Sequence, residues 1–152
     1  MRATTHAVTG AAIGLVVTEP LVAVPLALLS HYVCDIIPHY GADTSTQEEL
    51  NSTRFRVLLL IDACLCALLV LILALYRPQH WVLAAICAFV ATSPDLISVD
   101  LYRRARHGKP LKPNAYQRIA KGIQLFEKPI GAVVEVVWII AMLIIIVPII
   151  RR

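Results

Sequence analysis

The sequence predicts an all-α fold: a polytopic membrane helical bundle of about five helices, with an amphipathic interfacial helix before the last. The first observation is composition. The 152-residue chain is 59% hydrophobic and 16% charged, with a mean hydropathy of +0.74, whereas soluble domains are nearer half apolar and a quarter charged. The second is that apolar residues form continuous runs, unlike the alternating strands of a membrane β-barrel.

We expect one integral membrane domain over 1–152. The pattern divides it into a helical hairpin over 5–37, a polar loop over 40–56, a second hairpin over 57–99, a basic cytoplasmic segment over 100–128 and a last helix over 129–150.

The apolar runs differ in length, and length decides which of them can span a bilayer. Segments 57–75 and 129–150 are close to the roughly 20 residues that a bilayer requires, and 81–99 is a third candidate. Segments 5–17 and 21–37 are shorter and flank the turn at Glu19 and Pro20. They predict a hairpin that either crosses a thinned bilayer or re-enters it. Since 5–17 has no convincing small-residue cleavage site, we expect it in the mature protein.

The distribution of Lys and Arg predicts the orientation. With a cytoplasmic N-terminus, every Lys and Arg except Arg77, Arg151 and Arg152 falls on the cytoplasmic side, as the positive-inside rule requires. The sequence therefore predicts a multi-pass protein of the cytoplasmic (inner) membrane.

The basic segment predicts contact with lipid rather than nucleic acid, because its charges adjoin hydrophobic segments. Anionic headgroups are the expected partners of Arg103, Arg104, Arg106, Lys109 and Lys112. The oligomeric state stays open. The four cysteines lie in apolar runs without a CxxC pair, which disfavours a zinc ribbon or disulfide framework.

The interfacial helix is predicted near the end of this segment. Asn114 is a plausible N-cap, and Tyr116, Ile119, Ile123 and Phe126 recur at helical spacing. The helix either lies on the inner leaflet or packs on the surface of the domain itself.

Ionisable residues within the apolar runs are costly and are functional candidates by default. In the predicted topology they gather at the cytoplasmic ends of the helices, whereas the opposite side has only Glu19 and His80 besides its arginines. The set is His6, His31, Asp35, His39, Asp62, Asp95 and Glu135.

The stretch SHYVCDIIPHY has the spacing of a metal site. His31 and Asp35 are four residues apart, which places them on one helix face. Pro38 should end the helix and let His39 turn back toward the same site. Imidazole and carboxylate donors suit a divalent metal, Zn²⁺ before Mn²⁺ or Fe²⁺, and two metals if several carboxylates share the site. The alternative is that these residues form interhelical hydrogen bonds that stabilise the bundle.

Three short motifs resemble the bacterial and archaeal membrane-bound metal-dependent hydrolase family, an inner-membrane group that includes the LexA-binding hydrolase-like proteins. They are Thr5-His6-Ala7-Val8-Thr9-Gly10 with Ile13-Gly14, Ser30-His31-xxx-Asp35-Ile36-Ile37-Pro38-His39, and Pro94-Asp95-Leu96. The resemblance implies that His6, His31, Asp35, His39 and Asp95 are metal ligands. The chain departs from the family pattern after Asp95, where the usual Asp-His is absent.

The leading hypothesis is a metal-dependent hydrolase that acts on a lipid-linked phosphoester or ester at the cytoplasmic leaflet, with Asp62 or Glu135 as general base. The sequence has neither a GxSxG motif nor a catalytic cysteine signature, which disfavours a covalent nucleophile. Two alternatives use the same cluster: a cation- or proton-handling membrane protein, which should have polar residues throughout the bilayer depth, and a non-catalytic membrane scaffold.

Overall fold

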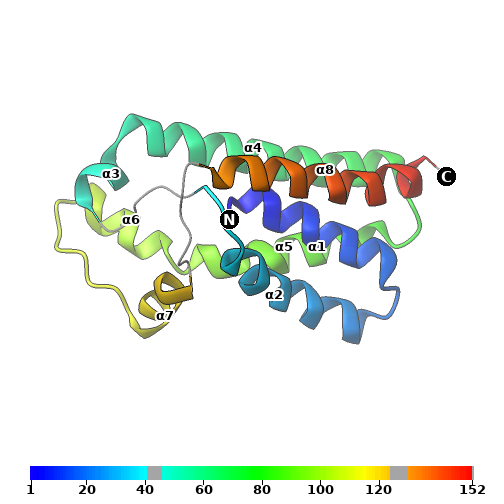
Figure 1. The fold of residues 1–152 in the computed structure, drawn as a ribbon, viewed down its shortest axis with the longest axis horizontal. Coiled ribbons are helices and arrows are strands. Elements are labelled where there is room, and N and C mark those ends of the chain that lie inside the picture. The colour runs from blue at the N-terminus through cyan, green and yellow to red at the C-terminus, as the bar shows by residue number, and fades with distance from the viewer. Residues whose placement is uncertain (41–45, 124–129, 152) are drawn as a thin grey trace.

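The computed structural model describes residues 1–40, 46–123 and 130–151, and this part of the chain is helical, with loops and no strand (Figure 1). The all-α prediction is confirmed. The predicted number of about five helices is wrong, because the described residues form eight. The additional helices are short and polar, and they lie in segments predicted as a loop and a basic linker.

Helix α1 (Ala3–Val16) is the centre of the bundle. It packs against α2 (Pro20–Ile36), α4 (Thr53–Tyr76), α5 (Trp81–Leu96) and α8 (Gly131–Ile150). Figure 1 shows α1 running between these longer helices. Because it has neighbours on several sides, most of α1 is buried, including its polar residues Thr5, His6 and Thr9.

Small residues allow α1 and α5 to approach closely. A Cβ at Gly10 would collide with the carbonyl group of Cys87 and lie 2.8 Å from the Ala91 Cβ, and a Cβ at Gly14 would lie 2.6 Å from the Cα of Ala84. Such small-residue contacts let helix backbones touch in apolar surroundings, where dispersion and polar contacts replace the hydrophobic effect. This packing positions the first turns of α1 against the far end of α5.

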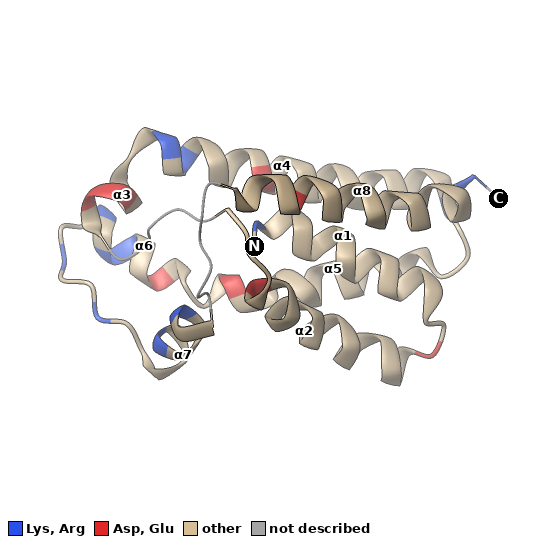
Figure 2. Ribbon diagram, in the orientation of Figure 1, with Lys and Arg blue, Asp and Glu red and all other residues tan. Residues whose placement is uncertain are grey.

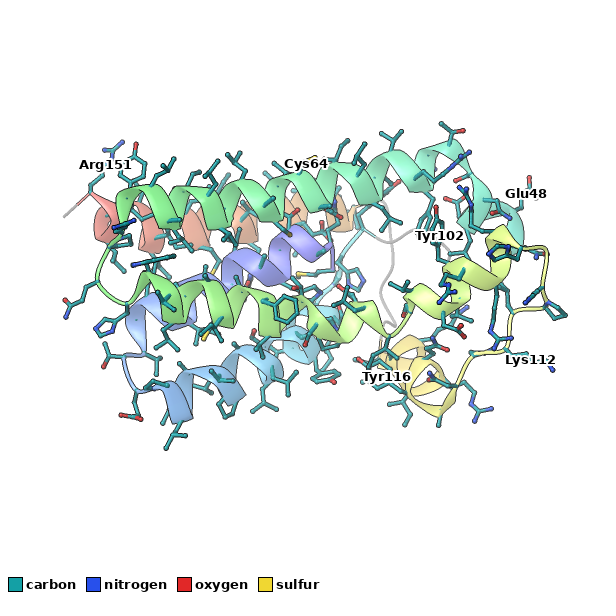
Figure 3. The ribbon with its side chains drawn as sticks, turned by 180° about the vertical axis from the view of Figure 1, so that it is seen from behind. Glu48, Cys64, Tyr102, Lys112, Tyr116 and Arg151 are labelled. Carbon is teal, nitrogen blue, oxygen red and sulfur yellow. The ribbon has the colours of Figure 1, made fainter. Side chains whose placement is uncertain are left out.

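Two single helices, α4 and α8, are long and apolar enough to cross a membrane, and the pair α5 and α6 (Val99–Arg106) is a third candidate if it counts as one span bent by 45°. The helices α1 and α2 are apolar but shorter. Most side chains of α4 and α8 are exposed, as Cys64 shows on the outer side of α4 in Figure 3. An apolar exposed surface of this extent fits a lipid environment.

Local signals set several helix ends. Helix α2 begins with Pro20 at its first position and ends at Ile36, two residues before Pro38, as the fixed φ of proline and its restriction of the preceding residue require. The Ser52 hydroxyl accepts a hydrogen bond of 3.0 Å from the Phe55 amide and caps α4.

The two unpredicted helices, α3 (Gln47–Asn51) and α6, are joined to each other. The Thr46 hydroxyl accepts a bond from the Glu49 amide at the start of α3, which is half of a capping box. The Asn51 side-chain amide donates to the Ala105 carbonyl of α6 at 3.0 Å. Since each helix is short, it depends on this tertiary contact and not on intrinsic propensity.

Helix α7 (Ala115–Ile123) corresponds to the predicted interfacial helix, and Asn114 caps it as expected. Asn114 Oδ1 accepts from the Gln117 amide and Gln117 Oε1 accepts from the Asn114 amide, both at 2.8 Å. Ile119 of the predicted stripe is exposed and Gln117 is buried, so at these positions the polar side chain and not the apolar one faces the rest of the protein. Phe126, the last residue of the predicted stripe, lies outside the described residues.

Charge is concentrated at one end of the molecule. Figure 2 shows most Lys, Arg, Asp and Glu on α3, α6 and α7 and on the adjoining ends of the longer helices, while the other half of the bundle is nearly free of them. This asymmetry agrees with the gathering of ionisable residues that the sequence predicts at one membrane side.

The α1 and α5 contact provides a test of the fold. We expect Gly10→Ala to lower the free energy of unfolding by about 1–3 kcal/mol, because the added methyl group forces the two backbones apart. The measurement is thermal or denaturant unfolding in detergent. Gly122→Ala in α7 is the matched control: nothing lies within 4 Å of its Cβ position, so the same change should be neutral or stabilising by up to about 1 kcal/mol. Equal effects at both sites would contradict the close packing.

Candidate metal centre

His6 is fully buried at the second turn of α1. Within the described part of the chain, no hydrogen bond of good geometry reaches either of its ring nitrogens. A buried polar atom without a partner costs about 1–3 kcal/mol of stability, so a ligand or a nearby polar group should compensate it. His6 faces a second histidine and two carboxylates, which together could hold such a ligand.

His31 approaches His6 from the last turns of α2. The centroids of the two imidazole rings are 4.1 Å apart, and the ring planes differ by 30°. His31 Nδ1 lies 2.9 Å from the Ala91 carbonyl oxygen of α5. Since a carbonyl only accepts, Nδ1 must carry the hydrogen, and in the neutral ring the lone pair is then on Nε2. A backbone carbonyl that fixes the tautomer in this way is typical of metal-binding histidines.

Asp35 lies one turn after His31 and contacts both rings. Its Oδ1 is 3.2 Å from His6 Nε2 and its Oδ2 is 3.4 Å from His31 Nε2. Oδ1 also pairs with the amino group of Met1. The predicted i, i+4 arrangement of His31 and Asp35 on one helix face is therefore what the structure has.

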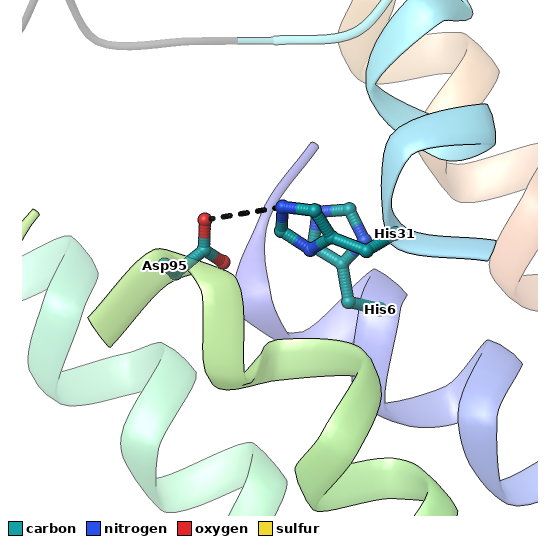
Figure 4. A group of neighbouring side chains, drawn as sticks. All are labelled: His6, His31 and Asp95. Carbon is teal, nitrogen blue, oxygen red and sulfur yellow. Dashed lines mark ion pairs between the residues drawn. The ribbon is translucent and has the colours of Figure 1, made fainter. Parts of the chain in front are cut away.

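Asp95 completes the group from α5. His6, His31 and Asp95 each offer a ligand atom, and these atoms all lie within 4.8 Å of one another. Figure 4 shows the three side chains converging, with His31 Nε2 and Asp95 Oδ1 3.9 Å apart. Asp95 is the most exposed of the three, with 39% of its side chain accessible. It follows Pro94 in the last turn of α5, next to the bend into α6.

The donor set fits a divalent cation. Two ligands that each lie about 2.1 Å from one tetrahedral zinc are about 3.4 Å apart, so the observed separations need only small side-chain adjustments. Imidazole nitrogen and carboxylate oxygen without thiolate suit Zn²⁺, Mn²⁺ or Fe²⁺. Cys34 is buried nearby on α2, but its sulfur lies 4.0 Å from the Thr9 hydroxyl, outside the group. His6 Nδ1, which has no hydrogen-bond partner among the described residues, and the fixed His31 tautomer are the structural observations that support this fit.

His39, a predicted ligand, lies apart from the three clustered groups. Its Nδ1 is 2.9 Å from the Ile37 carbonyl oxygen, and its backbone packs against Gly131 at the start of α8. Burial lowers the pKa of His39 below its ordinary value. The turn at Pro38 occurs as expected, but within the described residues it directs His39 toward α8.

Asp62 and Glu135, the predicted general bases, belong to a second buried cluster around Arg2. The Arg2 guanidinium is 3.0 Å from Asp62 Oδ1, and the Thr4 hydroxyl donates to the same oxygen at 2.6 Å. The Arg2 amide donates to Glu135 Oε1 at 3.3 Å. These contacts connect the start of α1 to α4 and α8. Neither carboxylate lines the cavity that adjoins His31 and Asp95.

A cavity of about 220 Å³ adjoins the metal group. Its walls come from α2, from the bend between α5 and α6, and from α7 with the loop before it. The lining residues are His31, Asp35, Pro94, Asp95, Ser98, Leu101, Leu111, Pro113, Tyr116, Gln117, Ala120 and Lys121. His31, Asp35 and Asp95 thus line an open space of ligand size.

Helix α7 closes one side of this cavity and is held there by polar contacts. The Gln117 side-chain amide donates to the Ile97 carbonyl at 2.9 Å, beside the bend between α5 and α6. The hydroxyl of Tyr116 adjoins that of Tyr32 on α2, and burial together with this neighbour raises the pKa of the Tyr116 phenol. Figure 3 labels Tyr116 on the side of α7 that faces the bundle.

Several polar residues of the site were not anticipated from the sequence. Arg2 and Thr4 hold Asp62, Thr9 accepts a bond from the Trp138 indole at 2.9 Å, and Gln117 and Lys121 line the cavity. The threonines could have been found from the sequence, because Thr4, Thr5 and Thr9 are polar residues at the start of an otherwise apolar helix. For Gln117, the spacing Asn114-x-x-Gln117 is a capping pattern, but its bond to Ile97 depends on long-range packing.

A scan against protein-family models gave no match, and searches of the curated proteins and of the solved structures gave no significant match.

The cluster around Arg2 is expected to stabilise the fold. We expect Asp62→Asn to lower the free energy of unfolding by about 1–3 kcal/mol, because it weakens the contacts to Arg2 and Thr4 inside the bundle. Asp100→Asn is the control: its pair with Arg104 is exposed, so the change should stay below about 1 kcal/mol. Chemical denaturation of both variants in detergent is the measurement. If Asp62→Asn unfolds like the wild type, the Arg2 cluster does not hold the helices together.

Proposed function

We propose that this protein is a metal-dependent hydrolase of the cytoplasmic membrane that acts on a lipid-linked phosphoester or ester. The observation that carries the proposal is the juxtaposition of His6, His31 and Asp95, whose ligand atoms lie within 4.8 Å of one another; His31 and Asp95 also line a cavity of about 220 Å³. The resemblance of the motifs around these residues to membrane-bound metal-dependent hydrolases points the same way.

The residues of the chain divide into distinct roles. His6, His31 and Asp95 would hold a divalent metal, with Zn²⁺ the first choice and Mn²⁺ or Fe²⁺ the alternatives. The Ala91 carbonyl orients the His31 ring through Nδ1. The Asp35 oxygens lie 3.2 Å from His6 Nε2 and 3.4 Å from His31 Nε2, beside the position that the metal would take. His39, which contacts Ile37 and Gly131, supports the turn that positions the end of α2.

A divalent metal in this group would supply Lewis acidity toward a phosphoryl or acyl oxygen and would make water a better nucleophile near neutral pH. Asp35 is the best placed carboxylate for a general base, because it lines the cavity and touches both histidines. Asp62 and Glu135 were predicted for this role, but their contacts with Arg2 favour a positioning function for them, since Arg2 and Thr4 precede His6 on the same helix.

The surroundings favour an anionic, membrane-bound substrate. Lys121 lines the cavity on the side of α7, and the basic residues of α6 and its following loop lie at the same end of the molecule (Figure 2). Positive charge at a membrane surface attracts anionic headgroups. With the N-terminus on the cytoplasmic side, the positive-inside rule puts this end at the inner leaflet.

Metal content is the first measurement that tests the proposal. We expect detergent-purified wild type to contain a stoichiometric divalent metal by mass spectrometry, and His31→Ala and Asp95→Asn to lose most of it. Removing a residue that only orients a metal ligand typically reduces metal affinity about 10-fold to 100-fold, and removing a ligand itself should cost no less. His107→Ala is the matched control, because His107 is exposed in the loop after α6 and should leave the metal content unchanged.

Wild type that neither contains a metal nor takes one up on reconstitution would reject the proposal and leave the cluster as an interhelical contact. Protein that binds a metal should next be assayed with chromogenic phosphomonoesters, phosphodiesters and carboxylic esters. Failure to cleave any of them while holding a metal would favour a non-catalytic cation-binding protein.

The proposed orientation has its own test. We expect a membrane-impermeant thiol reagent to label Lys112→Cys only from the cytoplasmic side and Gln79→Cys only from the other side, in a background with Cys64 replaced by Ser. Lys112 lies in the loop after α6 and Gln79 in the turn between α4 and α5, and both are exposed. Labelling from the reverse sides would overturn the cytoplasmic assignment and the positive-inside argument with it.

A further inference from the structure

A second, smaller cavity adjoins the first. It measures about 120 Å³ and lies between α3, the start of α4 and the α5 and α6 bend. The two cavities share Asp95, Ser98 and Leu101 in their walls. Asp95, a residue of the candidate metal centre, therefore lies in the wall that the two cavities share.

The two compartments differ in chemistry. The larger contains imidazole, carboxylate, amide and ammonium groups. Beyond the shared residues, the smaller is lined by Leu50, Phe55, Leu59, Val99 and Tyr102, and the Phe55 and Tyr102 rings lie 6.0 Å apart. One compartment suits an anionic headgroup and the other an apolar chain.

Two wall residues of the smaller cavity are well exposed. Leu59 on α4 is 44% exposed and Val99 on α6 is 47% exposed, so its wall reaches the outer surface of two membrane-spanning candidates. Arg54 and Arg56 at the start of α4 are exposed at the same level, which is typical of the boundary between headgroups and acyl chains. An apolar chain could enter sideways from the bilayer without leaving an apolar environment.

We propose that the smaller cavity binds the first methylenes of the alkyl or prenyl chain of a lipid phosphate, while the phosphate occupies the larger cavity beside Asp95. The inference rests on the proposed function for the identity of the larger site and specifies the substrate class as a chain-bearing lipid phosphate. Leu59, Val99 and Tyr102 are then the residues that select for a chain.

Binding of non-hydrolysable alkyl phosphonates tests this directly. We expect wild type in nanodiscs to bind dodecyl phosphonate about tenfold or more tightly than methyl phosphonate, which has no chain to place in the smaller cavity, after subtraction of empty-nanodisc partitioning, since each buried methylene contributes measurably to affinity. Leu59→Trp should fill the cavity and lower the affinity for dodecyl phosphonate toward that for methyl phosphonate. Leu65→Trp is the matched control, because Leu65 is a similarly exposed leucine of α4 (40%) that lines neither cavity.

A second readout does not depend on a variant that folds. A phosphonate with a diazirine near the headgroup should crosslink wild type at peptides containing Phe55, Leu59 or Tyr102, and excess dodecyl phosphonate should suppress the crosslink. Crosslinks elsewhere, equal affinities for both chain lengths, or no phosphonate binding would overturn the inference. Stoichiometric metal with chain-independent binding would reject the chain site alone, whereas chain-selective binding by metal-free protein would reject the hydrolase proposal and retain the lipid site.

Discussion

The close approach of α1 and α5 is the constraint on which the rest of the structure depends. Gly10 and Gly14 allow backbone contact with Cys87 and Ala84, and this contact determines how far His6 lies from Asp95. In apolar surroundings, the hydrophobic effect contributes little to helix association, so small-residue packing and buried polar contacts must hold the helices in register. A wider separation of α1 and α5 would take apart the cluster as well as the core.

The buried polar residues form two clusters with different chemistry. Around Arg2, the guanidinium pairs with Asp62, the Thr4 hydroxyl donates to Asp62, and a backbone amide donates to Glu135. Around His6, two imidazoles face two carboxylates, and His6 Nδ1 has no hydrogen-bond partner among the described residues. The first arrangement is what a structural network requires. The second has spare donor capacity, which a bound cation would use.

The bend between α5 and α6 links the long apolar helices to the site. The helix turns by 45° between Leu96 and Val99, and the freed Ile97 carbonyl accepts the Gln117 bond that holds α7 in place. Irregular backbone within an apolar protein is tolerated where other groups satisfy it or where it lines a cavity. Here both conditions hold, since Ser98 lies in the walls of both cavities.

The sequence by itself determined the helical class, the apolar segments and the local geometry of His31 with Asp35, because continuous hydropathy and i, i+4 spacing are properties of a single helix. Resemblance to known motifs also singled out His6 and Asp95, which the structure brings together. Only the tertiary structure decided that His39 turns toward Gly131 and that Asp62 and Glu135 pair with Arg2. It also determined α3 and α6, whose short, polar sequences gain their stability from bonds such as Asn51 to Ala105. These outcomes depend on contacts between residues distant in sequence, which periodicity and composition do not encode.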